Sequence, residues 1–444
     1  EGGVPVILTE SEVVDWTVRL LKTRKAEAEK LTRIHQYWKG DQPLPVAPRG
    51  VPVEVKRMAQ MSRVNVLGLV VDVLAQSLYV VGYREQGEPS DDEVWEVWQA
   101  NALDAHQTGV HRAALAYGTS YVLVLPGDPG PVVRGVSPRR LTALYGEDPD
   151  WPEVALEVRR TDMGTSYRLY DAEAVWFLDQ GDKRPGSDWN PVLDERQVHG
   201  IGSCPVVRFR NHDDLDDDLS GEIEPLIPLQ DQIDFTTFDL LVAQHFQSFR
   251  QRYVLGWTSE SETEKAKAAA SRLWTFDDPD VKVGEFGQTD LSGYLNSRES
   301  TLQHLATISQ TPPHHLLGKL VNLSAEALAA AESGQRRKIA EREVLFGEAW
   351  EQTLGLAARL EKREVSAGAQ VRWRDTEARA LASTVDALGK MAQMLNVPPA
   401  MLWEKIPGWT QQDVERAKAE LASADAIGGL AALLDRQMGG GDGG

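Results

Sequence analysis

The sequence predicts a mainly helical α+β protein with several domains, on three observations. The chain has 444 residues, 42% hydrophobic and 26% charged, which is ordinary globular composition and enough for two to four domains. Apolar residues recur at helical spacing in the first 117 residues and again after residue 219. Between them, short β-branched or alternating runs separated by turn residues indicate strands.

The charge and cysteine content narrow the function classes. The formal net charge is −20, from 67 acidic and 47 basic residues, which argues against a protein that grips DNA phosphates over a broad surface. The single cysteine, Cys204, excludes an intramolecular disulfide framework and a multi-thiolate zinc site. No run of 18 apolar residues and no signal-peptide pattern occurs in the sequence, so we expect a soluble, intracellular chain.

The first half begins with helices. Ser11 is placed to cap a helix that ends at Gly40, and prolines between 43 and 52 then predict an extended connector. A buried helix is expected over 64–81, followed by helices over 93–102 and 103–117. The strand-like runs are 121–125, 132–136, 154–160, 167–170, 174–178 and 206–209. We expect them to form one antiparallel, partly open sheet flanked by the helices.

The second half is helical on a larger scale. Pro228 suits the first turn of a helix that runs to about Arg250. A small mixed insert follows, with a helix over 262–273 and a strand over 281–286. The next helix, 291–310, stops at Pro312-Pro313, and Ser324 opens a long helix to about Lys362. A strand over 371–374 and a helical module over 376–438 complete the prediction, with no repeat of 20–50 residues.

Known catalytic motifs are absent from the sequence. Gly318-Lys319 looks like the end of a phosphate-binding loop, but Pro313 replaces the first glycine and Leu320 replaces the Ser/Thr. Gly200-Ile201-Gly202 fails the dinucleotide fingerprint, because Pro205 occupies the third glycine position. No metalloprotease, hydrolase or kinase signature occurs. We therefore expect a non-enzymatic protein without a cofactor.

One acidic segment, His212–Asp218, is the densest candidate for a metal site. Carboxylates suit a hard divalent cation, and the candidate ligands are Asp213, Asp214, Asp216 and Asp217. The alternative is a solvated loop before a helix, where negative charge also suits the helix N-terminus. His314 and His315 are a weaker pair, because adjacent histidines on regular structure point in different directions.

Several segments, taken together and in this order, carry a resemblance to a known family. They are Arg63-Val64-Asn65, His111–Tyr121 (HRAALAYGTSY), Gly221–Asp231 (GEIEPLIPLQD), and Thr311–Gly318 (TPPHHLLG) leading into Leu323–Leu328 (LSAEAL). With them the chain resembles the portal proteins of tailed double-stranded DNA bacteriophages, most closely the siphophage type found in many phages of actinobacteria. Portal proteins form the ring at the unique capsid vertex.

The resemblance implies a portal fold with wing, stem, clip and crown regions. The wing takes residues 1–220, and the stem takes the helices 221–250 and 291–311. The clip is the insert 251–290, and the tunnel loop is 312–323. The long helix in 324–375 returns through the wing, and 376–444 forms the crown helices with a flexible Gly-rich tail.

The resemblance also implies partners and sites. A homo-oligomeric ring of about twelve subunits would pass double-stranded DNA without sequence specificity, dock the terminase large subunit and a head-completion adaptor, and nucleate procapsid assembly with major capsid and scaffolding proteins. It would lie in the virion, after assembly in the host cytoplasm, with no membrane. The tunnel-loop candidates are Pro312, Pro313, His314, His315, Lys319 and Asn322.

Further candidates follow from the same regions. Phe238, Leu241, Phe246 and Phe249 are expected to pack between subunits or between helices, with packing inside one subunit as the alternative. Trp274 and Phe276 are candidate docking anchors in the clip. Two other functions remain open: a metal-dependent hydrolase or nuclease that uses segment 212–218, and a head–tail adaptor, although adaptors are usually much smaller.

Overall fold

The computed structural model divides the chain into two compact units. The larger unit contains Glu1–Trp38, Gly68–Pro225 and Leu323–Gly444, and the smaller unit contains Lys39–Leu67 and Leu226–Asn322. The structure describes residues 5–46, 50, 52–84, 92–162, 164–182, 188–216, 219–248, 252–255, 282–285, 290–318, 325–363, 368–374, 381–406, 409, 413–414 and 416–421.

The first helix, α1 (Glu10–Lys39), begins with a reciprocal cap. The backbone N–H of Thr9 donates to Glu12 Oε2 at 2.9 Å, and the N–H of Glu12 donates to the carbonyl of Thr9 at 3.0 Å. The Thr9 hydroxyl also donates to Glu12 Oε2, at 2.6 Å, and this bond, followed by the bond from the Thr9 backbone N–H, lowers the pKa of Glu12. The sequence prediction of Ser11 as the cap is therefore wrong by two residues, because Thr9, whose hydroxyl and backbone N–H both bond to the Glu12 carboxylate, precedes the first helical residue.

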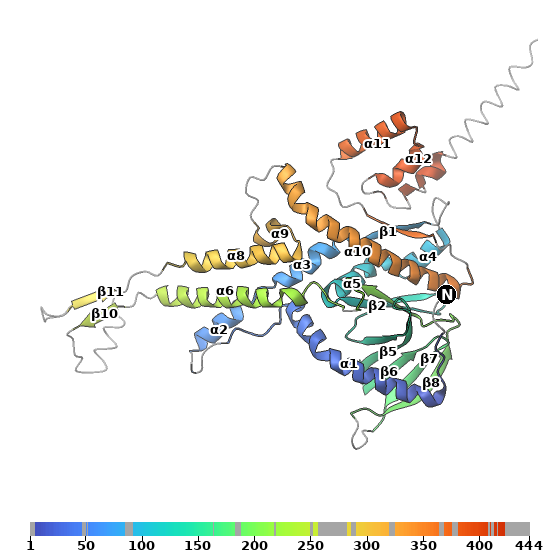
Figure 1. Cartoon of the computed structure of the whole chain (residues 1–444), viewed down its shortest axis with the longest axis horizontal. Coiled ribbons are helices and arrows are strands. Elements are labelled where there is room, and N and C mark those ends of the chain that lie inside the picture. The colour runs from blue at the N-terminus through green and yellow to red at the C-terminus, as the bar shows by residue number, and fades with distance from the viewer. Residues whose placement is uncertain are drawn as a thin grey trace, which may run out of the picture. The chain divides into compact units, whose positions relative to one another are not determined.

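A five-stranded antiparallel meander lies beside α1 in the larger unit (Figure 1). Its order is β4 (Leu141–Tyr145), β5 (Pro152–Thr161), β6 (Gly164–Tyr170), β7 (Ala174–Gln180) and β8 (Pro191–Val198). Leu20 and Leu21 of α1 belong to one buried cluster with Leu156, Leu169 and Trp176 of the sheet. This burial of apolar side chains fixes the helix against one face of the sheet.

A second antiparallel sheet has the order β3 (Val132–Val136), β2 (Thr119–Leu125) and β9 (Val206–Arg210). The six predicted strands are all present, but they divide between two sheets, so the prediction of one sheet is wrong. Leu123 and Val206 of the second sheet share a core with Leu141 and Tyr170 of the first. Strand β8 was missed because its sequence, PVLDERQV, carries many polar residues at an exposed edge, and the five-residue strand β4 (LTALY) was missed because it is short and lacks a clear alternation.

The helices of the larger unit include α3 (Val66–Ala75, which starts in the smaller unit), α4 (Asp92–Ala100), α5 (Leu103–Tyr117) and α10 (Ala325–Leu360). The helix expected over 64–81 ends early, because β1 (Val80–Arg84) pairs with β12 (Gln370–Trp373) as an antiparallel strand. Helix α5 ends at Gly118 with φ of 90°. A Cβ there would lie 2.8 Å from the backbone of Ser220, so the close approach requires glycine.

The smaller unit consists of helices α2 (Val53–Met61), α6 (Ile227–Ser248), α8 (Ser292–Ser309) and α9 (Pro313–Leu317). Strands β10 (Arg252–Leu255) and β11 (Lys282–Glu285) pair as an antiparallel ladder between α6 and α8 in sequence. Strand β11 agrees with the prediction over 281–286, whereas the helix expected over 262–273 lies outside the described residues.

Near the C-terminus, the structure has the helices α11 (Leu381–Leu395) and α12 (Pro399–Leu402) and the short 3₁₀ turn η2 (Trp403–Lys405), and residues 416–421 are also helical. One stretch of the described chain, Val53–Ala75, has the length and apolar composition of a membrane span. It consists of two helices, α2 and α3, and more than half of it is buried. This burial is typical of core helices.

Candidate functional site

Helices α6 and α8 pack along each other in the smaller unit and coincide with the two predicted helices 228–250 and 291–310. Helix α6 carries Asp231, Asp234 and Asp239 and has no lysine or arginine. Helix α8 carries one arginine and one glutamate, so the pair is acidic. Three large apolar side chains on the pair are more than half exposed: Phe235, Leu295 and Ile308.

The buried carboxylate of Asp234 holds the start of α6 to the segments on either side of α2. It accepts hydrogen bonds from Gln42 Nε2 at 2.7 Å, Gln230 Nε2 at 2.8 Å and the backbone N–H of Val64 at 3.1 Å. Burial raises the pKa of Asp234, and these bonds partly offset that effect. The two bonds from Gln42 and Val64 therefore attach to α6 the chain before the proline-rich connector and the chain after α2.

The structure places the four predicted stem-packing residues in different environments or does not describe them. Phe238 is buried in a small cluster with Val55 and Ala59 of α2 in the same chain. Leu241 is half-buried, whereas the Phe246 side chain and Phe249 lie outside the described residues. Phe238 thus packs between helices of one subunit, and the intersubunit role of the other three stays a prediction.

The predicted tunnel loop begins as a tight helix reversal. Gln310 has a left-handed φ of 55° and ends α8, and Pro312 and Pro313 then start the five-residue helix α9. The rings of His314 and His315 lie 4.3 Å apart, measured between centroids. Lys319 and Asn322 lie outside the described residues, as do the clip candidates Trp274 and Phe276.

The acidic segment after β9 does not form a metal site in the described part of the chain. Asp213 makes an ion pair with Arg210 at 3.1 Å, and the Asp214 carboxylate accepts the backbone N–H of Asp216 at 2.8 Å. Among the described residues, which leave out Asp217, no three His, Cys, Asp or Glu side chains are grouped to hold a metal ion. Cys204 is buried, as predicted, and burial raises the pKa of its thiol.

A buried ionic cluster joins α10 to the segment before α6, and the sequence did not predict it. The Glu222 carboxylate accepts hydrogen bonds from Lys338 and, at 3.3 Å, from Arg342 Nη2. Arg342 Nε also donates to Asn211 Oδ1 at 2.9 Å, and all four side chains are buried. Burial, and then the charge of Arg342, lower the pKa of the neighbouring His212.

The only sequence signal for this cluster was Gly221-Glu222 in the segment GEIEPLIPLQD. Gly221 lies so close to α5 that a Cβ would fall 2.3 Å from the Ala116 carbonyl oxygen. On α10, Lys338 and Arg342 are one helical turn apart and look like an ordinary solvated face. Their burial depends on elements more than 100 residues away in the sequence.

A second buried polar contact joins α10 to α5. The indole N–H of Trp350 donates to Nε2 of His111 at 2.8 Å, and Nδ1 of His111 lies 3.1 Å from the carbonyl oxygen of Leu78. Because an indole nitrogen only donates, His111 is neutral with its proton on Nδ1. Complete burial lowers the pKa of His111 to about 3. The ring stacks on Phe346, 5.1 Å away between centroids.

The comparisons with known proteins identify the family. Residues 19–426 match the family model described as phage portal protein, SPP1 Gp6-like. The chain therefore belongs to the phage portal protein family, and it is a structural component of a virion rather than an enzyme. This membership confirms the resemblance and removes support for the hydrolase alternative.

Two curated relatives are portal proteins of mycobacteriophages. The portal protein of Mycobacterium phage D29 is 28% identical over 372 residues, which cover 77% of this chain and 75% of the relative. That of Mycobacterium phage L5 is 28% identical over 376 residues, with 78% and 76% covered.

Two solved structures from gene transfer agent (GTA) particles match most of the length of the chain. A chain from the virion of a native GTA particle has a TM-score of 0.46 and 12% identity, and covers 80% of this chain and 97% of its own. A chain from the neck of a native GTA particle, computed with C12 symmetry, has a TM-score of 0.43 and 12% identity, with 83% and 99% covered.

Proposed function

We propose that this portal protein forms a closed ring of about twelve subunits at the unique capsid vertex and conducts double-stranded DNA during packaging and ejection. The observation that carries the proposal is the acidic pair of long helices, α6 and α8. DNA carries one negative charge per ~1.7 Å, and every lysine or arginine on a tunnel wall adds affinity that resists translocation. A wall that presents Asp231 and Asp239 of α6, and no lysine or arginine from that helix, would surround the duplex without binding it tightly.

The regions are assigned on the same basis. Residues 1–220 form the wing, 221–250 and 291–311 the stem, 251–290 the clip and 312–323 the tunnel loop. Residues 324–375 carry the long helix back through the wing, and 376–444 form the crown. This assignment is supported by the order of the elements, since the β10–β11 ladder separates two paired helices in sequence.

A closed ring needs head-to-tail contacts that repeat from one subunit to the next. The exposed Phe235, Leu295 and Ile308 of α6 and α8 supply apolar surface for such contacts. The clip then presents Trp274 and Phe276 to the terminase large subunit during packaging and later to a head-completion adaptor. Major capsid and scaffolding proteins surround the ring during procapsid assembly in the host cytoplasm.

The test is the mass and shape of the purified protein, by native mass spectrometry with negative-stain images. We expect closed rings with a central hole that retain little duplex DNA at physiological salt. A chain that stays monomeric at every concentration and salt, alone and with its capsid and scaffolding proteins, would contradict the proposal. Rings that bind duplex DNA tightly through α6 would also contradict the proposal, because an acidic tunnel wall should keep the affinity for DNA low.

A further inference from the structure

The β4–β5 ribbon of the larger unit carries unpaired positive charge at one end. Strand β4 pairs with β5 from Leu141↔Glu157 to Tyr145↔Pro152, so Arg140 and Arg160 lie at the same end. Both are exposed, and neither has a carboxylate within ion-pair distance in the described part of the chain. Arg24 of α1 joins them, because its Nη2 donates to the carbonyl of Arg139.

This arginine end, defined by Arg24, Arg139, Arg140 and Arg160, is short of negative partners. Arg24 Nη1 is buried and has no hydrogen-bond partner among the described residues. Burial lowers the pKa of Arg24, and the charges of Arg160 and Arg139 lower it further, although Glu27 opposes them. Glu27 offsets only part of the charge of these four arginines, and the remaining positive charge favours an anionic partner from outside the subunit.

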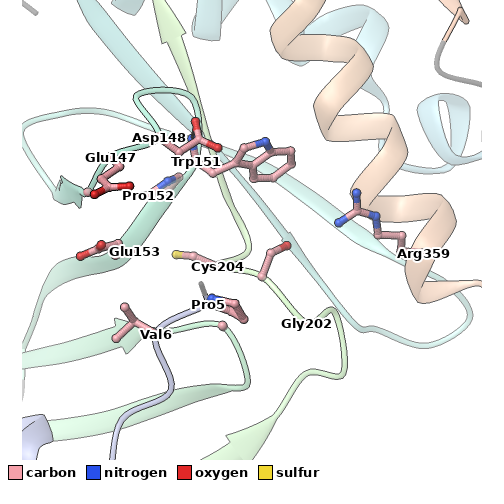
Figure 2. Close-up of a pocket in the computed structure, with 13 residues that line it drawn as sticks. Pro5, Val6, Glu147, Asp148, Trp151, Pro152, Glu153, Gly202, Cys204 and Arg359 are labelled. Carbon is pink, nitrogen blue, oxygen red and sulfur yellow. Dashed lines mark hydrogen bonds between the residues drawn. The ribbon is translucent and has the colours of Figure 1, made fainter. Parts of the chain in front are cut away.

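The opposite end of the same ribbon forms an acidic pocket of about 340 Å³, shown in Figure 2. Glu147, Asp148 and Glu153 lie on one side, and Arg359 of α10 reaches toward it from the other. The guanidinium of Arg359 lies 5.9 Å from the ring of Trp151. The pocket thus has three carboxylates and one guanidinium, a surplus of negative charge.

Two of the three carboxylates are free for a ligand. Asp148 is occupied, because its carboxylate accepts the backbone N–H groups of Asp150 at 2.9 Å and Trp151 at 3.3 Å and so holds the turn. Glu147 and Glu153 make no ion pair or hydrogen bond with the residues that the structure describes. A pocket that combines free carboxylates with an indole ring suits a guanidinium.

We infer that the arginine end of one subunit docks against the acidic pocket of the next subunit, so that Arg140 and Arg160 meet Glu147 and Glu153 around the ring. The inference rests on the ring proposed above and deepens it. Six residues of extended chain separate Arg140 from Glu147, a distance of roughly 20 Å. The positive arginine end and the acidic pocket therefore lie at opposite ends of the β4–β5 ribbon. A head-to-tail interface needs this arrangement, since one surface of each subunit must complement a different surface of its neighbour.

The experiment uses two full-length variants that fail alone and assemble together. Variant one is Arg140→Glu with Arg160→Glu, and variant two is Glu147→Arg with Glu153→Arg. Each variant alone brings like charges together at every interface. We therefore expect the protein concentration at which rings form to rise at least tenfold. Mixed one to one, they can alternate around a ring with opposite charges at every interface, and native mass spectrometry should show rings that contain equal numbers of both.

A matched control is Arg57→Glu with Arg337→Glu. It reverses two exposed arginines outside the arginine end, so its net charge equals that of variant one. It should assemble like the unmodified chain, and circular dichroism should show that all variants are folded. If either variant forms rings alone, or if the mixture forms none, the inference is wrong, whereas the proposal that the unmodified chain forms a ring still holds. A monomeric unmodified chain would instead refute the ring and the proposed function.

Duplex DNA is another polyanion whose charge is complementary to the arginine end. Electrophoretic binding of a 30-base-pair duplex by the unmodified ring, lost in variant one with assembly unchanged, would reassign these arginines to DNA and overturn the inference. We expect no such difference. Assembly of the unmodified chain should also weaken as salt is raised, because exposed ion pairs are screened.

Discussion

Acid should weaken the attachment of α10 to α5 through one residue, His111. Its ring is completely buried, accepts the Trp350 indole N–H and lies 3.1 Å from the Leu78 carbonyl oxygen. Protonation of Nε2 would turn an acceptor into a donor that faces another donor, and it would bury a charge without a counterion. The perturbation is therefore a drop in pH from 7.5 to 4.5, compared between the unmodified chain and His111→Gln, which does not titrate.

The magnitude follows from the two pKa values of His111. In the unfolded chain the imidazole has its ordinary pKa of 6.5, whereas in the folded chain burial lowers it to about 3. Below pH 6.5 the unfolded chain binds a proton that the folded chain does not, so stability falls as pH falls and the loss ends near pH 3. Each pH unit costs up to ~1.4 kcal/mol, so the loss between pH 6.5 and 4.5 is roughly 2–3 kcal/mol.

The assay is urea unfolding followed by circular dichroism at fixed protein concentration, at pH 7.5, 6.5, 5.5 and 4.5. His111→Gln should be less stable at pH 7.5 by ~1–3 kcal/mol, because one amide replaces two imidazole contacts imperfectly. The gap between the two proteins should then shrink by roughly 2–3 kcal/mol at pH 4.5. Burial also lowers the pKa of His199 and His212, but these groups act equally in both proteins. If the free energy of unfolding falls with pH by the same amount in both proteins, the reasoning is refuted.

Three further predictions concern other parts of the fold. Arg342→Met removes one of the two cations paired with buried Glu222 and leaves Lys338 and the amide of Asn211 on that carboxylate, so the free energy of unfolding should fall by ~2–4 kcal/mol. The matched control, exposed Arg337→Met on the same helix, should change it by less than ~0.5 kcal/mol, and equal losses in urea unfolding would contradict the stabilising role of the Arg342–Glu222 pair. Gly118→Ala places a Cβ 2.8 Å from the Ser220 backbone and should cost more than ~2 kcal/mol, while Gly200→Ala, with a similar positive φ but nothing within 4 Å, should cost only ~1 kcal/mol in thermal unfolding. Lys319→Ala should alter DNA packaging or retention in a packaging assay and leave the rings seen by native mass spectrometry intact, and a variant that forms no rings would remove Lys319 from the tunnel loop.

Local chemistry explains which parts of the fold were predictable. The helices α1, α5, α8 and α10 show apolar periodicity, and the first three end at or just before a glycine or proline, so the bounds of all four agree with the prediction to within a few residues. Strand β8 was missed because its sequence, PVLDERQV, is that of an exposed edge. The helix predicted over 64–81 ran too far, because the pairing of β1 with β12 connects residues almost 300 apart.

The candidate site was predictable only in part. The two helices α6 and α8, the proline pair after α8 and the portal resemblance were all evident in order along the chain. The partners of Glu222 and His111 were not, because Lys338 and Trp350 lie 116 and 239 residues away. Helical periodicity reports which residues share a face, and it does not report which faces meet.

The sequence by itself determined the acidic charge, the order of helices and strands, and the family to which the chain belongs, because these depend on composition and on neighbours a few residues apart. Only the tertiary structure decided which charged side chains are buried and paired, as with Glu222 and Arg342, and which remain unpaired at the two ends of the β4–β5 ribbon. The physical reason is that burial and ion pairing depend on strand register and helix packing, which bring together residues that are distant in sequence.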